Sequence, residues 1–275
     1  MTREQKYDAF KALHERQGCF VIPNPWNAGT ARILTSLGFE ALATTSAGYA
    51  FAVGRRDSSA GLTRDEILQN AREIVEATNL PVSADLEDGF GRSPEICAAT
   101  IRLAAGAGLV GGSIEDATGI AKDPIYEFNL AVDRVAAAAN AAHKCKFVLT
   151  ARAENFLHDC PDLADTIRRL RAFAQVGADV VYAPGLPSLD AIREVCASVP
   201  KPVNVVMGLK GPAWSVEELA GVGVKRISVG GAFARAALGA FVRAAREVKD
   251  KGTFSFAADA IPHAVVNGYM ENGRR

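Results

Sequence analysis

Short apolar stretches alternate with longer amphipathic ones along most of the chain. The apolar stretches do not alternate with polar residues, which is typical of strands that are covered on both faces. They lie at residues 19–22, 41–46, 81–87, 110–116, 146–152, 178–183, 203–207 and 226–229. Helical spacing of apolar residues predicts helices at residues 2–17, 28–37, 64–78, 94–107, 124–143, 163–176, 189–198, 215–220 and 231–249.

Local signals support these boundaries and point to one architecture. Thr63 followed by Glu66 is a capping-box pattern, and Pro94 after Ser93 is typical of a first helical turn. The strands and helices alternate with short connections, which favours an α/β fold with a parallel sheet. The simplest closure is an eight-stranded (β/α)8 barrel of the TIM type. An open, doubly wound sheet is the alternative.

The barrel pattern does not use the whole chain. No linker interrupts residues 1–252, which we assign to one catalytic barrel domain, and residues 253–275 form a C-terminal helical extension. This extension has one apolar face, made of Phe254, Phe256, Ile261, Val265, Val266, Tyr269 and Met270. Such a tail needs a partner surface, either on its own barrel or, by exchange, on a neighbouring subunit.

Charge and composition exclude several classes of partner. The chain of 275 residues has 31 basic and 31 acidic side chains, so no net charge draws it to nucleic acid or to an anionic membrane. We see no leader peptide and no apolar run long enough to span a bilayer, and therefore expect a cytoplasmic protein. The five cysteines form no CxxC pair, so neither a disulfide framework nor a zinc site is indicated.

The most distinctive polar stretch follows the third predicted strand, where Asp85, Glu87 and Asp88 stand within four residues. On a strand, Asp85 and Glu87 share a face, whereas Asp88 points away and is expected to be structural. Neighbouring carboxylates repel unless a cation lies between them. With Glu115 from the next strand end, Asp85 and Glu87 would suit Mg²⁺ or Mn²⁺. A solvated acidic loop is the alternative.

Other strand ends carry complementary groups. The active site of a β/α barrel lies at the carboxyl ends of its strands. Arg152 and Glu154 end the fifth predicted strand, and a guanidinium is suited to bind a carboxylate. Further candidates for substrate contact are the backbone of Ser46, Ala47 and Gly48, together with Asn204, and Tyr182 ends the sixth predicted strand. Of the four histidines, His158 is singled out because it lies in a loop after a strand. Charges that only neutralise one another at the barrel rim are the alternative.

These motifs resemble the isocitrate lyase/phosphoenolpyruvate mutase superfamily. The resemblance rests on residues 46–48, 54–57, 85–91, 113–116 and 150–154, read in this order. It implies a Mg²⁺-dependent barrel enzyme that makes or breaks a C–C or P–C bond beside an α-keto acid. It further implies dimers or tetramers with an exchanged C-terminal helix.

The resemblance also implies roles for single residues. Asp85 would be the nearest protein ligand of the metal, and Glu87 and Glu115 would act through metal-bound waters. The substrate carboxylate would be held by Ser46, Ala47, Gly48 and Arg152. Asp57 would approach the substrate from the loop after the second strand, and this loop position makes it a catalytic candidate with Arg152 and Tyr182.

One loop departs from the family pattern. The C–C lyases of the family have a K-K-C-G-H motif after the fourth strand, but residues 118–124 contain neither Cys nor His. Tyr182 or a metal-bound water is then the candidate for moving the proton. We expect a lyase that cleaves a small 2-oxo or 2-hydroxy di- or tricarboxylate through an enolate, resembling methylisocitrate lyase or oxaloacetate decarboxylase. The alternatives are a P–C bond enzyme and a non-catalytic oxoacid-binding barrel.

Overall fold

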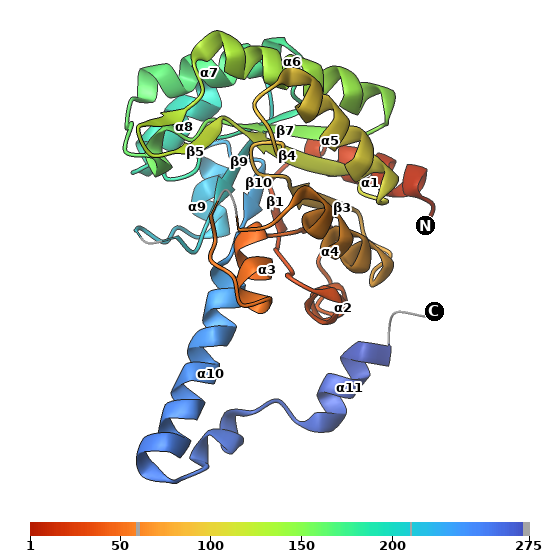
Figure 1. Ribbon diagram of the computed structural model, residues 1–275, viewed down its shortest axis with the longest axis vertical. Helices are drawn as coiled ribbons and strands as arrows, with labels where there is room; N and C mark the ends of the chain where they lie inside the picture. Colours follow the sequence, from red (N-terminus) through yellow and green to blue (C-terminus); the bar gives the residue numbers. More distant parts are fainter. Residues whose placement is uncertain (59–60, 210, 272–275) are drawn as a thin grey trace.

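The centre of the molecule is one parallel sheet of eight strands (Figure 1). The computed structural model describes residues 1–58, 61–209 and 211–271. The strand order is β1-β10-β9-β8-β7-β4-β3-β2, and each neighbouring pair is parallel. The strands are β1 (Phe20–Ile22), β2 (Leu42–Ala43), β3 (Val82–Asp85), β4 (Gly111–Glu115), β7 (Val148–Arg152), β8 (Val180–Tyr182), β9 (Val203–Val206) and β10 (Arg226–Ser228).

The two ends of this strand order come together at a seam. Just beyond β1 and inside β2, the Ala43 N–H donates to the Pro23 carbonyl at 3.0 Å. The Asn24 side chain donates to the Thr44 carbonyl at 2.9 Å, and its own oxygen accepts from the N–H groups of Val229 and Gly230. The sheet is therefore a nearly closed barrel, which confirms the predicted (β/α)8 fold over an open sheet.

The helices lie outside the sheet, as the amphipathic stretches predict (Figure 1). Thr63 and Glu66 form the predicted capping box at the start of α4, and Pro94 is the first residue of α5. The helices that match predicted ranges are α1 (Arg3–Glu15), α2 (Ala28–Ser36), α4 (Arg64–Glu76), α5 (Pro94–Gly106), α6 (Phe128–Lys144), α7 (Leu163–Gln175), α8 (Leu189–Ser198), α9 (Val216–Gly221) and α10 (Ala232–Lys251).

Two segments differ from the prediction. Helix α3 (Ser46–Ala52) begins where the second strand was expected to continue, because the Thr45 side chain caps it by accepting the Gly48 N–H. An antiparallel hairpin, β5 (Ala117–Ile120) and β6 (Asp123–Ile125), occupies the expected start of α6. Helix α6 begins later because the Glu127 carboxylate accepts the first N–H groups of the helix.

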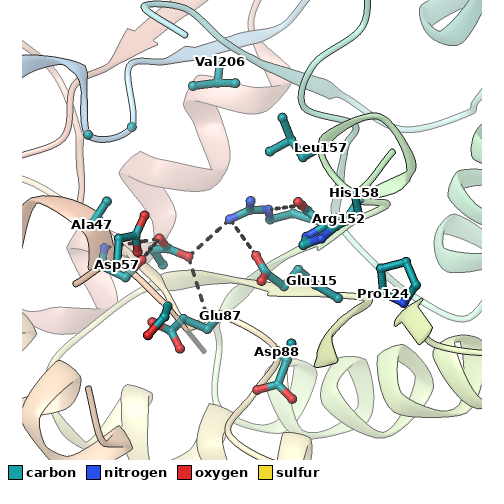
Figure 2. Close-up of a pocket in the computed structure, with 18 of the residues that line it drawn as sticks. Ala47, Asp57, Glu87, Asp88, Glu115, Pro124, Arg152, Leu157, His158 and Val206 are labelled. Carbon is teal, nitrogen blue, oxygen red and sulfur yellow. Dashed lines mark hydrogen bonds and ion pairs between the residues drawn. The ribbon is translucent and has the colours of Figure 1, made fainter. Parts of the chain in front are cut away.

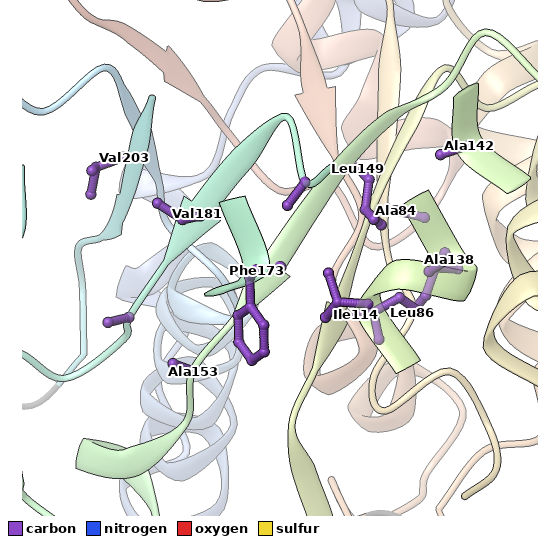
Figure 3. Packing of buried hydrophobic residues seen from close by; sticks show 14 of the residues in the cluster. Ala84, Leu86, Ile114, Ala138, Ala142, Leu149, Ala153, Phe173, Val181 and Val203 are labelled. Carbon is purple, nitrogen blue, oxygen red and sulfur yellow. The ribbon is translucent and has the colours of Figure 1, made fainter. Parts of the chain in front are cut away.

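Apolar side chains fill the space on both sides of the barrel wall. Between the wall and the outer helices, Leu86, Ile114, Leu149 and Phe173 pack together (Figure 3). A second cluster of residues from α1 and the starts of the strands closes the amino-terminal end of the barrel, around Phe10. Only the carboxyl ends of the strands are left for an active site.

The C-terminal part leaves the barrel. Helix α10 projects away from it, and the chain then turns through η2 (Ser255–Asp259) into α11 (His263–Glu271), which returns to α2 (Figure 1). There the Arg32 guanidinium donates to the Met270 carbonyl. In the described part of the chain, none of the helices is long and apolar enough to cross a membrane.

Candidate active site

A cavity of about 510 Å³ opens at the carboxyl ends of the strands (Figure 2). It brings together most of the predicted site residues, although they come from distant parts of the sequence. Those that line it are Ser46, Ala47, Asp57, Asp85, Glu87, Glu115, Arg152, Glu154 and Tyr182. Gly48 and Asn204 lie outside it.

Arg152 is the hub of this cavity. Its Nη1 lies 3.3 Å from Asp85 Oδ1 and 3.1 Å from Glu115 Oε2, and its Nε donates to Glu154 Oε1 at 2.8 Å. The guanidinium also lies 4.9 Å from the centre of the Tyr182 ring. Burial by itself lowers the pKa of Arg152, but the surrounding carboxylates outweigh it and raise the pKa well above its ordinary value. Arg152 is therefore a fixed positive charge between Asp85 and Glu115.

The acidic stretch reaches the cavity through a turn and not along a strand. Strand β3 ends at Asp85, two residues before the predicted end, and Glu87 has a left-handed backbone with φ of 49°. The Glu87 N–H points back to Asp85 Oδ1 at 3.4 Å. Asp85 and Glu87 thus line one cavity, but the strand alternation from which we inferred this is wrong.

Acidic groups outnumber basic ones in the cavity. Burial, followed by the charges of Asp85 and Asp57, raises the pKa of Glu87 to about 8. Burial also raises the pKa of Glu115 well above its ordinary value and that of Asp57 to a smaller degree. Raised pKa values of this kind are expected when buried carboxylates have too little positive charge nearby.

The oxygen donors of Asp85, Glu87 and Glu115 fit a hard divalent cation in both chemistry and charge. Within the described residues, however, no three Asp, Glu, His or Cys side chains are already gathered as a metal-binding group. Arg152 lies between Asp85 and Glu115 instead. The positive charge between Asp85 and Glu115 is thus an arginine of the chain itself, and the predicted Mg²⁺ or Mn²⁺ stays a prediction.

The backbone predicted to bind a second anion is partly occupied by the protein. The Ser46 hydroxyl and N–H donate to Asp85 Oδ2 at 2.8 and 3.3 Å. The Gly48 N–H donates to the Thr45 side chain, and a Cβ at Gly48 would lie 2.7 Å from Thr45 Cγ2. Gly48 is therefore a close-packing position within α3, and Ala47 lines the cavity itself.

Asn204 lies deeper in the barrel, against a smaller cavity of about 70 Å³ that also reaches Asp85 and Arg152. Its amide donates to Ser228 Oγ at 3.1 Å and accepts from Arg226 Nε at 2.7 Å. Burial lowers the pKa of Arg226 to about 10. Asn204 thus supports a buried cation beneath the main cavity.

Asp88 has the structural contacts that we expected of it, although it also borders the cavity. Its carboxylate accepts from the Tyr126 hydroxyl at 3.0 Å and from the Phe90 N–H at 2.8 Å. The fully buried Arg134 donates to the carbonyls of Gly91 and Arg92 at 2.5 and 2.7 Å and to that of Asp88. These bonds hold the acidic turn against α6.

Comparison with known proteins identifies the family. A family model described as phosphoenolpyruvate phosphomutase matches residues 10–249. The chain belongs to this family. Its match covers the barrel and every residue of the site described above, which confirms the resemblance to the isocitrate lyase/phosphoenolpyruvate mutase superfamily.

Related proteins cover nearly the same length. A presumed lyase/mutase of Burkholderia cenocepacia J2315 is 56% identical in sequence, with a TM-score of 0.95 over 97% of this chain and 96% of that chain. A 2,3-dimethylmalate lyase is 26% identical, with a TM-score of 0.86 over 98% and 95% of the two chains. The 2-methylisocitrate lyase of Escherichia coli is 27% identical over 77% of this chain and 73% of its own.

In this member of the phosphomutase family, loop residues complete the cavity. Sequence reasoning singled out His158 but missed Leu157, Val206, Leu209 and Ile120. Leu157 and His158 follow β7, Leu209 follows β9, and Ile120 belongs to the hairpin after β4. The signal that they shared was their place after the carboxyl end of a strand.

Proposed function

We propose that the protein is a lyase that cleaves a C–C bond beside the carbonyl or carboxylate of a small 2-oxo or 2-hydroxy di- or tricarboxylate. The observation that carries this proposal is one cavity in which Asp85, Glu115 and Glu154 contact Arg152 and Glu87 lines the wall. The similarity to 2-methylisocitrate lyase and 2,3-dimethylmalate lyase supports the same reaction class.

In this proposal Mg²⁺ or Mn²⁺ is held by Asp85, with Glu87 and Glu115 beside it. When bound, the ion supplies positive charge against the negative charge that develops on the substrate oxygen as the bond breaks. Arg152 holds the substrate carboxylate. In the described residues its contacts to carboxylates use Nε and Nη1, which leaves Nη2 for the substrate.

Proton transfer falls to residues on the cavity walls. Asp57 and His158 lie on opposite sides of Arg152 (Figure 2). Burial raises the pKa of the Tyr182 phenol, so Tyr182 is a donor at neutral pH and not a base. A neutral imidazole has one ring nitrogen that donates a hydrogen and one that accepts. We assign His158, with Tyr182 as the alternative, to the proton that the family's loop cysteine would move.

Product analysis tests this function. The protein is incubated with Mg²⁺ and oxaloacetate, methylisocitrate, 2,3-dimethylmalate or phosphonopyruvate, and products are followed by NMR. Pyruvate with a second carboxylate, or with carbon dioxide, is the expected result. Oxoacid binding by calorimetry without turnover of any compound would contradict it and favour a non-catalytic binding barrel.

A P–C bond enzyme is the second candidate, because the matching family model is described as a phosphomutase. Phosphate release from phosphonopyruvate, or its isomerisation, would identify this activity. The charge of the cavity argues against it, since a phosphonate dianion would meet six carboxyl groups and, among the described lining residues, one arginine.

A further inference from the structure

One part of the mouth of the active-site cavity is apolar, whereas Asp57 and Ser58 are exposed at another part. Leu157, Leu209 and Ile120 line the apolar part, although 45%, 40% and 55% of their surfaces are exposed. Val206, at the end of β9, continues this lining inward and is buried. Leu157 and Val206 lie on the side of Arg152 away from Glu87 and Asp88 (Figure 2). We call these four residues the apolar rim.

The charges of the cavity limit how many carboxylates a substrate can bring. Asp57, Asp85, Glu87, Asp88, Glu115 and Glu154 all line it. Among the described lining residues, Arg152 is the single arginine or lysine, and it already lies within 3.3 Å of three carboxylates. A third carboxylate on the substrate would meet the apolar rim or these acids, and an unpaired carboxylate is strongly disfavoured there.

We propose that the substrate carries a short alkyl group on the carbon that leaves, and no third carboxylate. This inference rests on the proposed lyase function and narrows it to 2-hydroxy C4-dicarboxylates with an alkyl substituent on carbon 3. Leu157, Leu209, Ile120 and Val206 are then the specificity-determining residues, because they are the large aliphatic side chains among the described residues that line the cavity.

The cleavage balances for a 2-hydroxy acid of this class. The C2 hydroxyl loses its proton, the C2–C3 bond breaks, and C2 becomes the carbonyl of a 2-oxo acid. The electron pair of the broken bond stays on C3, which takes up a proton. The products are a 2-oxo acid and an alkyl-substituted acetic acid, whose atoms together equal those of the substrate.

A matched series of substrates tests the inference directly. Malates with hydrogen, methyl, ethyl or carboxymethyl on carbon 3 are compared in the presence of Mg²⁺, by kcat/KM and by calorimetric Kd. Each methylene that is buried should improve both by about fourfold. The carboxymethyl compound should be about a hundredfold weaker than the ethyl compound. A preference for carboxymethyl over ethyl would overturn the proposal.

Variants of the apolar rim test whether its side chains cause the preference for alkyl-substituted malates. Leu157→Ala and Leu209→Ala should each reduce the ethyl-over-hydrogen ratio by about fivefold or more, and Leu157→Arg should improve binding of the carboxymethyl compound. Leu103→Ala on α5 is the control, because Leu103 is also 45% exposed but lies outside the cavity. Unchanged ratios in both alanine variants would refute the role of the rim.

Measurements of binding and of turnover test two different claims: binding tests the alkyl selectivity, and turnover tests the lyase function on which the inference rests. Oxalate, which has no alkyl group, should bind the Leu157→Ala variant and the unaltered protein equally. If no malate is cleaved but the ethyl compound still binds more tightly than the carboxymethyl compound, the lyase function fails and the rim's selectivity stands. Cleavage without alkyl preference would support the lyase function and refute the selectivity of the rim.

Discussion

His14 joins helix α1 to the buried cation beneath the active site. It is buried, its Nδ1–H donates to the Phe10 carbonyl at 2.8 Å, and its Nε2 faces Arg226 Nη1 at 3.3 Å. Nε2 can accept from Arg226 only when the imidazole is neutral. Burial, followed by the charge of Arg226, lowers the pKa of His14 to about 3. In the folded state His14 therefore stays neutral at pH values below about 6.5, at which it binds a proton in the unfolded chain.

This shift predicts loss of stability in mild acid. Between about pH 6.5 and 3 the unfolded chain binds more protons at this position, so the free energy of unfolding falls as the pH falls. At about pH 5 the loss from His14 should be about 2 kcal/mol relative to about pH 7. Urea unfolding at both pH values measures it. The His14→Gln variant should lose less stability between them, and an equal loss in both proteins would contradict the assignment.

Asp85 is the residue on which the metal proposal depends most directly. Asp85→Ala should abolish Mg²⁺ binding, measured by calorimetry, while far-UV circular dichroism shows an intact fold. Asp190→Ala is the control, because Asp190 is an exposed acid in an ion pair with Arg193. Unchanged Mg²⁺ affinity in Asp85→Ala would rule out the proposed ligand.

Among single residues, those directly at strand ends were predictable from the sequence. Asp85, Glu115, Arg152 and Tyr182 each end a strand, and the apolar runs showed where the strands end. Glu87 reached the site through a positive-φ turn that its residue type does not favour. Leu157 and the other rim residues were missed, because a place at or after a strand end does not by itself distinguish a residue that lines the site from its neighbours.

At the scale of elements, the turn after β3 is held by helix α6. Glu87, Gly89 and Phe90 all have positive φ, and such a backbone persists only where its surroundings enforce it. Arg134 provides this enforcement by donating to carbonyls of the turn, while its guanidinium lies 4.0 Å from the centre of the Tyr126 ring. The acidic half of the site thus depends on a side chain that does not line it.

Removing the guanidinium should therefore affect stability and activity together. Arg134→Met leaves the turn carbonyls unpaired in a buried place, and we expect a loss of about 3 kcal/mol in the free energy of unfolding. Urea unfolding measures this loss, and kcat/KM should fall as the Glu87 carboxylate is displaced. Arg72→Met, at an exposed position on α4, is the control. Equal stability of the two variants would contradict this role.

Helices and strands were predictable from the sequence where the residues that begin and end them lie within a few positions of each other. The capping box of α4 and the strands between helices were predicted because each is read within a few residues. The hairpin β5–β6 was missed because its pairing competes with a nearby helix start, and the outcome depends on Glu127 capping α6. Helix α3 was missed because its first residue was assigned to the second strand and because seven residues are too few to show a clear helical spacing.

At the scale of the whole molecule, the C-terminal arm, formed by α10, η2 and α11, is the part with the largest unexplained apolar surface. Large apolar side chains stay exposed along it, namely Phe233, Leu238, Phe241, Val242, Phe254, Phe256, Ile261 and Val265. Exposed apolar surface of this extent is typical of a subunit interface. We therefore propose a homodimer or homotetramer in which the arm reaches a neighbouring barrel.

Substitution of one arm residue tests this assembly. Phe241 is 69% exposed, and Phe241→Asp should shift the protein towards the monomer because a buried charge disfavours the interface. Size-exclusion chromatography with light scattering measures the mass. Ala236→Asp is the charge-matched control, because Ala236 is exposed on the same helix but lies on a different face from Phe241. A monomeric unaltered protein, or a Phe241→Asp variant that stays fully oligomeric, would contradict the proposal.

The seam between β1 and β2 is the place where we expect the barrel wall to open locally. At other positions around the wall, neighbouring strands share a ladder, whereas here Ala43 and the Asn24 side chain make the connection. Amide protons near Ala43 should therefore exchange with solvent before those of β4 and β7. Helix α3 and Asp57 follow β2 on this side of the barrel, whereas Asp85 and Glu115 lie on β3 and β4, which share a ladder. Local opening at the seam would therefore leave the strands of these two acids folded.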